Sequence, residues 1–369
     1  MKKLLSVLNV QGATSVSVPI VLLCVLTLAS SFASPLVRRD VTTMLVYVVF
    51  VVGLYVFVGN SGILSFGHAS FMLIGAYVTA LVTIPVTTKS VLLPHLPSFV
   101  ADLQLSVVPA AAMAGIVAAL FAGLAGAPLM RLAGIAATIA TFALLLVANT
   151  VANNWDAVTR GRGTMIGVPT ETTRYRALLF ACLAIVVAYA FQRSRVGLEL
   201  RASREDSVTA SSVGINVVRA RWIAFVVSGF VTGVAGFLYA QLLGAYSPDT
   251  FFLTTTFLAI AMLVIGGIYS LGGAVIGTVA VSALTAGLRH IERGIDLYVF
   301  DLPARPGTEK LGVALAMMVI LIFRPNGLVG DHEIEFRLLA RWRGGRATVQ
   351  PMQASDLSNA PARDSQAGM

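Results

Sequence analysis

The stretch RSRVGLELRASREDSVTASSVGINVVRAR, residues 193–221, is the longest strongly charged segment enclosed between apolar runs, with six Arg against three acidic residues. Ser203 is placed to cap a short helix, and Asp206 three residues later completes a capping-box-like pair. Gly214 stands where a left-handed residue would end that helix. Because a helix of about ten residues is marginal alone in water, we expect it to pack on the rest of the chain or on another protein. An ordinary basic loop at a membrane surface is the alternative.

The composition places this stretch in an integral membrane protein. The chain is 57% hydrophobic and 12% charged, about half the charged fraction of a soluble domain. Its apolar runs approach the ~20 residues of a spanning helix and lack the polar alternation of a barrel strand. The net charge of +9 fits basic cytoplasmic loops and anionic lipids better than nucleic acid. Cys24 and Cys182 lie in apolar runs and predict no disulfide framework.

The apolar runs predict an all-α bundle of about ten membrane segments. A cleaved signal peptide is the competing interpretation of the first run, with Ser31–Ala33 as the cleavage site. The eighth and ninth runs flank GGIYSLGG (266–273), and they form either two spans or one span with a re-entrant piece. The predicted spans are Val18–Ala33, Val41–Val58, Ile63–Ile84, Val107–Ala125, Ala133–Ala152, Ala177–Gln192, Trp222–Leu243, Phe257–Ile268, Leu271–Leu288 and Leu311–Phe323.

The charges between the runs predict how the bundle is oriented. If residues 193–221 are cytoplasmic, counting helices places the N-terminal lysines and the Arg-rich C-terminal part on the same side, as the positive-inside rule requires. Arg38, Arg39, Arg160 and Arg162 then fall outside, against that rule. We therefore predict a cytoplasmic N-terminus (1–17), a transmembrane domain (18–323) and a cytoplasmic tail (324–369) that is disordered after about residue 347.

The predicted spans contain no Asp, Glu, Lys or Arg, and His68 is their only imidazole. Proton-driven carriers usually need such groups in the membrane. The chain also lacks the phosphate-binding G-x-x-x-x-G-K-[ST] motif. A transport bundle of this kind is either passive or driven by a partner, with sodium coupling through backbone carbonyls still open. A bundle driven by a partner needs a structured handle, which favours a coupling role for residues 193–221. Nothing in the spans suggests a catalytic or metal site.

Several further segments form an ordered series along residues 46–330. They are GNSGILSFGHASFMLIGAY (59–77), TIATFALLLVANT (138–150), TRGRGTMIGVP (159–169), GLELRASREDSVTASSVGIN (197–216), AFVVSGFVTGVAGFLYA (224–240), SPDTF (247–251), GGIYSLGGAVIG (266–277) and FRPNGLVG (323–330). In number, order and spacing they resemble the LivM-type permease subunits of ABC importers for branched-chain and related amino acids.

The resemblance implies a heteromeric importer in the bacterial inner membrane, with both termini of this chain cytoplasmic. Its other parts would be a homologous LivH-like permease, two ATP-binding subunits and an extracytoplasmic substrate-binding protein. ATP would be bound by the partners, so this chain needs no cofactor of its own. The implied function is inward translocation of branched-chain or related hydrophobic amino acids by alternating access. The alternatives are a permease for urea or another small amide, and an ATP-independent channel or sodium-coupled carrier.

The resemblance also implies roles for individual residues. Two positions depart from the family pattern, because Ser203 and Ser207 stand where an aliphatic and an acidic residue are usual, which leaves the matching ATPase open. In the outer loop, Arg160 replaces a glycine. The residues of the coupling segment, which would contact the ATPase, are Arg201, Arg204, Glu205, Asp206, Ala210 and Gly214.

Two further groups have both a functional and a structural interpretation. Ser65, His68 and Phe71 line the translocation path, or His68 is a structural residue that is hydrogen-bonded to a neighbour. Arg160 and Arg162 contact an acidic patch on the binding protein, or they are solvated charges at the rim of the membrane.

Overall fold

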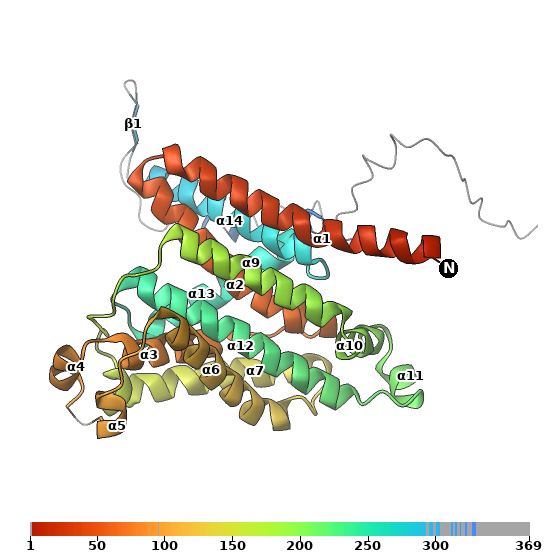
Figure 1. Ribbon diagram of the computed structural model, residues 1–369, viewed down its shortest axis with the longest axis horizontal. Coiled ribbons are helices and arrows are strands. Elements are labelled where there is room, and N and C mark those ends of the chain that lie inside the picture. The colour runs from red at the N-terminus through yellow and green to blue at the C-terminus, as the bar shows by residue number, and fades with distance from the viewer. Residues whose placement is uncertain are drawn as a thin grey trace, which may run out of the picture. The chain divides into compact units, whose positions relative to one another are not determined.

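The computed structural model describes residues 2–94, 96–292, 295–297, 300–302, 311, 312, 314, 315, 318, 322 and 327–329. That part of the chain folds into helices and one small antiparallel hairpin (Figure 1). The elements are α1 (Lys2–Ala29), η1 (Ser30–Phe32), α2 (Pro35–Ser61), α3 (His68–Thr83), α4 (Val86–Leu92), α5 (Ser98–Ala101), α6 (Val107–Leu129), α7 (Gly134–Asn154), α8 (Asp156–Thr159), α9 (Arg174–Arg193), α10 (Arg195–Glu205), α11 (Ser207–Ser212), α12 (Val217–Leu243), η2 (Pro248–Phe251), α13 (Leu253–Gly266), α14 (Leu271–Glu292), β1 (Ile295–Leu297) and β2 (Phe300–Leu302).

The predicted multi-pass helical fold is confirmed. Seven described helices are long and apolar enough to cross a membrane, and the bent pair α3–α4 makes an eighth. The set includes Pro248–Gly266, which joins η2 to α13, and Leu271–Arg289 of α14, which favours two spans around the GGIYSLGG turn. The run Val16–Phe32 is a shorter apolar helix, and α1 continues without a break across the predicted boundary between residues 17 and 18. The predicted span Leu311–Phe323 and the predicted tail lie mostly outside the described residues.

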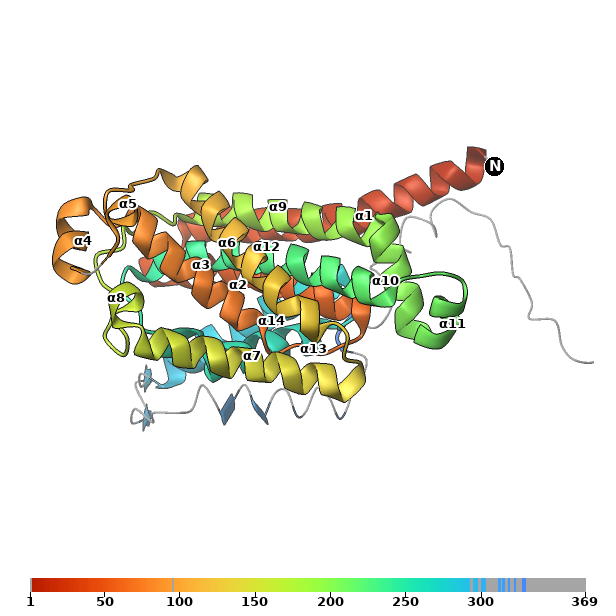
Figure 2. The same cartoon turned by 90° about the horizontal axis from the view of Figure 1, so that it is seen from below.

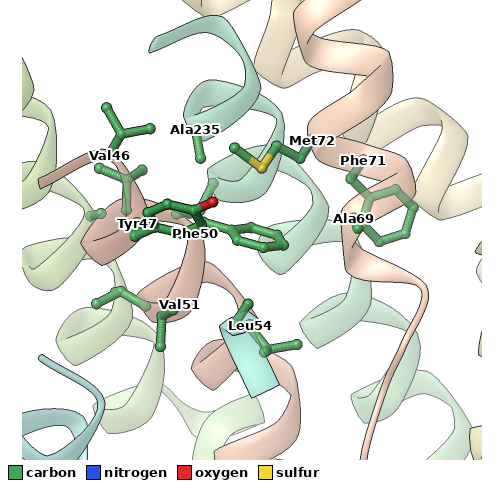
Figure 3. Packing of buried hydrophobic residues seen from close by; sticks show 14 of the residues in the cluster. Val46, Tyr47, Phe50, Val51, Leu54, Ala69, Phe71, Met72 and Ala235 are labelled. Carbon is green, nitrogen blue, oxygen red and sulfur yellow. The ribbon is translucent and has the colours of Figure 1, made fainter. Parts of the chain in front are cut away.

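Helix α2 forms the centre of the bundle. Every residue from Met44 to Ser61 is buried, and α9, α12 and α14 pack against it. Figure 3 shows side chains of α2, among them Phe50, packed together with Met72 of α3 and Ala235 of α12. A helix that is apolar on all sides belongs inside a large bundle, and that is where α2 lies.

Local sequence signals explain where α2 and α3 begin and end. Pro35 occupies the first turn of α2, and Gly62 ends it with φ 71°. The third predicted span is wrong at its start, because the helix begins at His68 and not at Ile63. The irregular segment between the two helices is satisfied by a neighbour, since the Phe66 amide donates to the Thr141 hydroxyl at 3.3 Å.

Glycines allow α3 and α12 to touch backbone to backbone. A Cβ on Gly75 would overlap the Gly233 carbonyl oxygen, and one on Gly236 would overlap the Met72 carbonyl oxygen. The Gly229-xxx-Gly233 pair of α12 lies against α6, where Ala118 and Ala122 meet it. Small residues at these spacings are what bring membrane helices close together.

The two ends of the bundle carry different elements. Helices α10 and α11 lie at one end, here called the α10 end, and α4 and α5 lie at the opposite end (Figures 1 and 2). Helix α2 runs between them, from Pro35 at the opposite end to Ser61 at the α10 end. At about 1.5 Å per residue, its 27 residues span about 40 Å.

Candidate functional site

The charged stretch 193–221 folds as two helices, α10 and α11, and not as the single short helix predicted from Ser203. Ser203 is buried inside α10, where its hydroxyl donates to the Leu200 carbonyl at 2.7 Å. The residue that caps α10 is Ser194, whose hydroxyl accepts from the Gly197 amide at 3.2 Å. The prediction that Ser203 caps a helix was therefore wrong, because this stretch contains two helices and each has a capping residue of its own.

Asp206 caps the second helix. Its carboxylate accepts from the amides of Val208 at 2.9 Å and Thr209 at 3.2 Å, and from the Thr209 hydroxyl. The Thr209 hydroxyl and these amides favour the ionised form and lower the pKa of Asp206. Gly214 follows the end of α11 with φ 88°, the left-handed conformation expected of a glycine at that position.

Arg204 connects α10 to the membrane bundle. Its Nη1 donates to the Gly59 carbonyl near the end of α2 at 2.9 Å. Its guanidinium also lies over the Tyr269 ring in the α13–α14 turn, 4.3 Å from the ring centroid. The Gly59 carbonyl is among the last four of α2, which have no partner within the helix, so Arg204 satisfies a group that would otherwise be orphaned.

Glu205, the residue after Arg204, faces away from the bundle. Glu205 accepts from Arg204 Nη2 at 2.8 Å, but its side chain is 74% exposed while that of Arg204 is 23% exposed. Arg201 resembles Arg204, because its Nη2 donates to the Gln192 carbonyl at the end of α9 at 2.8 Å. The two predicted coupling arginines thus hold α10 onto the ends of α2 and α9, and Glu205 is available to a partner.

Helix α11 and the residue that follows it expose two valines among serines and a threonine. Ala210 is buried under it, whereas Val208 and Val213 are 73% and 74% exposed. Beside it, a groove of about 350 Å³ separates α10 from the start of α12. The groove is lined by Arg195, Val196, Glu199, Gly214, Asn216, Arg219, Ala220 and Ile223.

The structure brings Ser65, His68 and Phe71 together in the interior. His68 Nδ1 lies 2.8 Å from the Ser65 hydroxyl and Nε2 lies 2.9 Å from the Ser228 hydroxyl of α12. The Phe71 ring is 5.5 Å from the imidazole centroid, and Phe57 and Phe225 complete the cluster. With both ring nitrogens in hydrogen-bonding contact and aromatic rings around it, His68 joins α3 to α12.

The predicted outer loop contains two arginines in different situations. Arg160 has φ 60°, and its Nη1 donates to the Thr164 carbonyl of the same loop at 2.6 Å. Glycine adopts this left-handed conformation without strain, which agrees with a glycine being usual at this position in the family that the sequence resembles. Arg162 is exposed. Of the two, Arg162 is the better placed to meet a partner.

The sequence reasoning missed one feature at the opposite end of the bundle. Asp40 of α2 and Arg289 of α14 flank a cavity of about 560 Å³, with 3.7 Å between Asp40 Oδ1 and Arg289 Nη1. Each residue stands directly beside a predicted span, just outside its apolar run. Their opposite signs, on the same predicted side of the membrane, were the available signal. In the described residues no group of three or more His, Cys, Asp or Glu side chains could hold a metal.

Comparison with known proteins agrees with this architecture. The family described as "Branched-chain amino acid transport system / permease component" matches residues 36–323. No solved structure matches the chain.

Three curated relatives illustrate the range of similarity. The high-affinity branched-chain amino acid transport system permease protein LivM of Salmonella typhimurium is 26% identical over 325 residues, covering 79% of this chain and 69% of the relative. LivM of Escherichia coli is 26% identical over 345 residues, covering 84% and 74%. The corresponding protein LivH of Escherichia coli is 31% identical over 158 residues, covering 43% and 46%. The chain belongs to the family of permease components of branched-chain amino acid transport systems, non-catalytic multi-pass membrane subunits of bacterial ABC transporters.

Proposed function

We propose that this chain carries branched-chain or related hydrophobic amino acids inward across the bacterial inner membrane, driven by ATP hydrolysis on separate subunits. Two relatives are named for branched-chain amino acid transport, which supports this substrate class. The α10 end then faces the cytoplasm, together with both termini. ATP binds only to the partners, so the chain itself uses no cofactor.

The observation that carries the proposal is the construction of the α10–α11 unit. Its outer surface exposes Val208, Val213 and Glu205, whereas its inner side is fixed to the bundle by Arg201 and Arg204. A partner that moves this unit therefore pulls directly on α2 and on the α13–α14 turn. An unattached surface loop would transmit no such displacement. The partners proposed here are two ATP-binding subunits, one docked on this unit and one on a homologous LivH-like permease.

At the opposite end we propose contact with a substrate-binding protein. Arg162 is exposed in the loop that precedes α9, and Arg160 shapes that loop from within. Exposed charges at the rim of an interface accelerate association with a partner of opposite charge. For the interior, we propose that His68 is structural and supports the path together with Ser65 and Phe71.

The test is uptake in liposomes. The chain is reconstituted with its second permease and ATP-binding subunits, and radiolabelled L-leucine uptake is measured with and without ATP, vanadate and the binding protein. We expect uptake that needs all components, is inhibited by vanadate and is not competed by urea. Gradient-driven accumulation by the chain alone would contradict the proposal and favour a carrier, and uptake of urea would redirect the substrate.

Docking is tested separately by cysteine cross-linking. Val208→Cys and Val213→Cys should form cross-links to a cysteine-bearing ATP-binding subunit. Val91→Cys is the matched control, because Val91 is also exposed but lies on α4 at the opposite end. Equal cross-linking of all three variants would show that α11 is not the docking surface.

A further inference from the structure

The cavity at the opposite end of the bundle has a defined position and lining. It lies between the first turns of α2, the last turns of α12, the start of α13 and the end of α14. Its volume of about 560 Å³ is within the ~300–1,000 Å³ typical of small-molecule sites. A smaller extension of about 20 Å³, room for about one water, continues from it past Met44 and Thr285.

Charged groups of both signs meet in this cavity. The Arg289 and Asp40 side chains are 40% and 23% exposed, and the 3.7 Å between Nη1 and Oδ1 is longer than the ~2.7–2.9 Å of a direct charged hydrogen bond. The two charges are thus close enough to attract each other, but the distance between them is too long for a direct hydrogen bond. Arg39 and Asp249 add one charge of each sign to the lining.

Hydroxyl groups surround the charges. The Tyr47 and Tyr239 rings lie 5.9 Å apart in the wall, with Thr43 and Thr255 near them. In the extension, the Ser282 and Thr285 hydroxyls are buried and have no hydrogen-bond partner among the described residues. Leaving such a group unsatisfied costs ~1–3 kcal/mol, so these hydroxyls favour a polar occupant.

The rest of the lining is apolar. Leu36, Leu242, Leu243 and Leu258 contribute hydrocarbon surface to the same cavity. A ligand that matches every part of this lining carries one positive group, one negative group and a small hydrocarbon side chain. A zwitterionic α-amino acid has this composition, whereas urea has no charges and a purely cationic or anionic solute would leave one partner unmatched.

We propose that this cavity binds a free hydrophobic amino acid, with Arg289 receiving its α-carboxylate and Asp40 its α-ammonium. The inference deepens the proposed function and rests on it, because it names the groups of the substrate that this chain itself recognises. The ligand lies beside the two charges and adds a direct contact with each of them.

The two helices that carry these charges also meet at the α10 end. Helix α2 carries Asp40 at one end and the Gly59 carbonyl bound by Arg204 near the other. Helix α14 begins just after Tyr269, which lies under the Arg204 guanidinium, and ends near Arg289. A displacement of α10 therefore changes the separation of Asp40 and Arg289, which gives the docked ATPase control over this site.

The experiment is equilibrium binding to the purified full-length chain in nanodiscs, using three ligands with one side chain. L-leucine has both charged groups, 4-methylpentanoate lacks the ammonium and 3-methylbutylamine lacks the carboxylate. We expect leucine to bind wild-type protein at least 10-fold more tightly than either truncated ligand. Asp40→Asn and Arg289→Gln should each weaken leucine at least 10-fold. Asp40→Asn should bind 4-methylpentanoate at least as tightly as wild type, because it removes a charge of the same sign as the ligand, and Arg289→Gln should do the same for 3-methylbutylamine.

Controls separate this result from misfolding. Glu171→Gln removes a carboxylate from a loop outside the cavity lining and should bind leucine as wild type. The ligand series on wild-type protein tests the proposal even if a variant is unstable. Equal binding of the three ligands, no leucine binding, or binding of phosphoethanolamine in place of leucine would overturn the cavity assignment. If the cavity assignment fails but ATP-driven leucine uptake is observed, the proposed function still holds. If leucine binds as expected but ATP-driven uptake is not observed, the cavity assignment holds and the proposed function is contradicted.

Discussion

The Arg204 guanidinium donates to the Gly59 carbonyl at 2.9 Å, across 145 residues of sequence. Through this contact, a charged side chain of α10 caps the C-terminal end of α2, the central helix of the bundle. Because the guanidinium also lies over the Tyr269 ring, Arg204 joins α2, α10 and the α13–α14 turn.

Replacing Arg204 should separate ATP hydrolysis from transport. Arg204→Ala removes the hydrogen bond to Gly59 and the contact with Tyr269, but leaves Val208 and Val213 on the docking surface. We expect the complex to assemble and hydrolyse ATP while leucine uptake falls at least 10-fold. The measurement is the ratio of leucine transported to ATP hydrolysed in proteoliposomes.

Two other substitutions calibrate that result. Arg195→Ala removes an arginine from the same helix whose side chain is 93% exposed, so coupling should stay near wild type. Glu205→Ala should weaken docking more than coupling, because Glu205 faces outward. If Arg204→Ala transports normally, the connection described here does not transmit force.

Asp206 should make the order of α11 depend on pH. Its pKa is lowered in the folded protein, so the ionised carboxylate stabilises α11 above the unfolded pKa, and this contribution is lost as pH falls through the folded pKa. Amide hydrogen exchange of residues 208–213, corrected for its intrinsic pH dependence, should accelerate only below about pH 4. Asp206→Asn should keep protection without the pH dependence, and Asp206→Ala should lose protection at every pH. Unchanged exchange in Asp206→Ala would show that the cap does not hold α11.

His68 should matter for stability more through packing than through its hydrogen bonds. Hydrogen bonds between membrane helices average about 0.6 kcal/mol, so Ser228→Ala should cost little. His68→Ala leaves a cavity among three aromatic rings and should cost about 3 kcal/mol. His68→Phe fills that space and should recover part of the loss, as measured by thermal unfolding in detergent. A His68→Ala variant with wild-type stability and no uptake would instead place His68 on the path.

Helix α14 offers a matched pair of glycines. A Cβ on Gly273 would lie 2.7 Å from the Gly266 carbonyl oxygen, whereas no atom of the described residues lies within 4 Å of a Cβ on Gly287. Gly273→Ala should lower the free energy of unfolding by about 1–3 kcal/mol because the helices must separate. Gly287→Ala should be neutral or stabilise by up to about 1 kcal/mol. Equal thermal stabilities would show that the two helices are not in backbone contact.

The outer loop should respond differently to its two arginines. Arg162→Ser should slow association of the substrate-binding protein a few-fold at low salt, and the difference should shrink at high salt as screening increases. Arg160→Gly keeps the left-handed backbone but loses the contact with Thr164, and should change the rate less. Stopped-flow association at two ionic strengths makes the comparison. An Arg162→Ser rate equal to wild type at low salt would remove Arg162 from the interface.

The sequence predicted the bundle well because hydrophobic length is a local property. It failed where the backbone departs from a continuous helix. The third span was predicted to start at Ile63, but the segment between Gly62 and Gly67 is irregular. The reason is that irregular backbone inside a bundle depends on a partner such as Thr141, which lies 75 residues from Phe66. Capping was misread for a similar reason, since Ser194, Ser203 and Asp206 are all chemically able to cap and only the packing of α10 chooses between them.

The functional residues show the same difference between what local sequence determines and what tertiary packing determines. Resemblance selected Arg204 and Glu205 together, but their opposite orientations depend on where α2 and Tyr269 lie. Asp40 and Arg289 are far apart in sequence and were not paired at all. Contacts between distant helices are set by tertiary packing, and no local pattern in this sequence encodes them.

The backbone contacts of α3 with α12 have a mechanical consequence. Where Gly75 meets the Gly233 carbonyl and Gly236 meets the Met72 carbonyl, sliding one helix along the other would bring a side chain into a space that holds no more than a glycine. Shear between packed helices is therefore blocked at this seam, and α3 and α12 must tilt as one block. The hinges of any opening motion then lie at the ends of this block, in the irregular segment before His68 and in the left-handed Gly244 after α12.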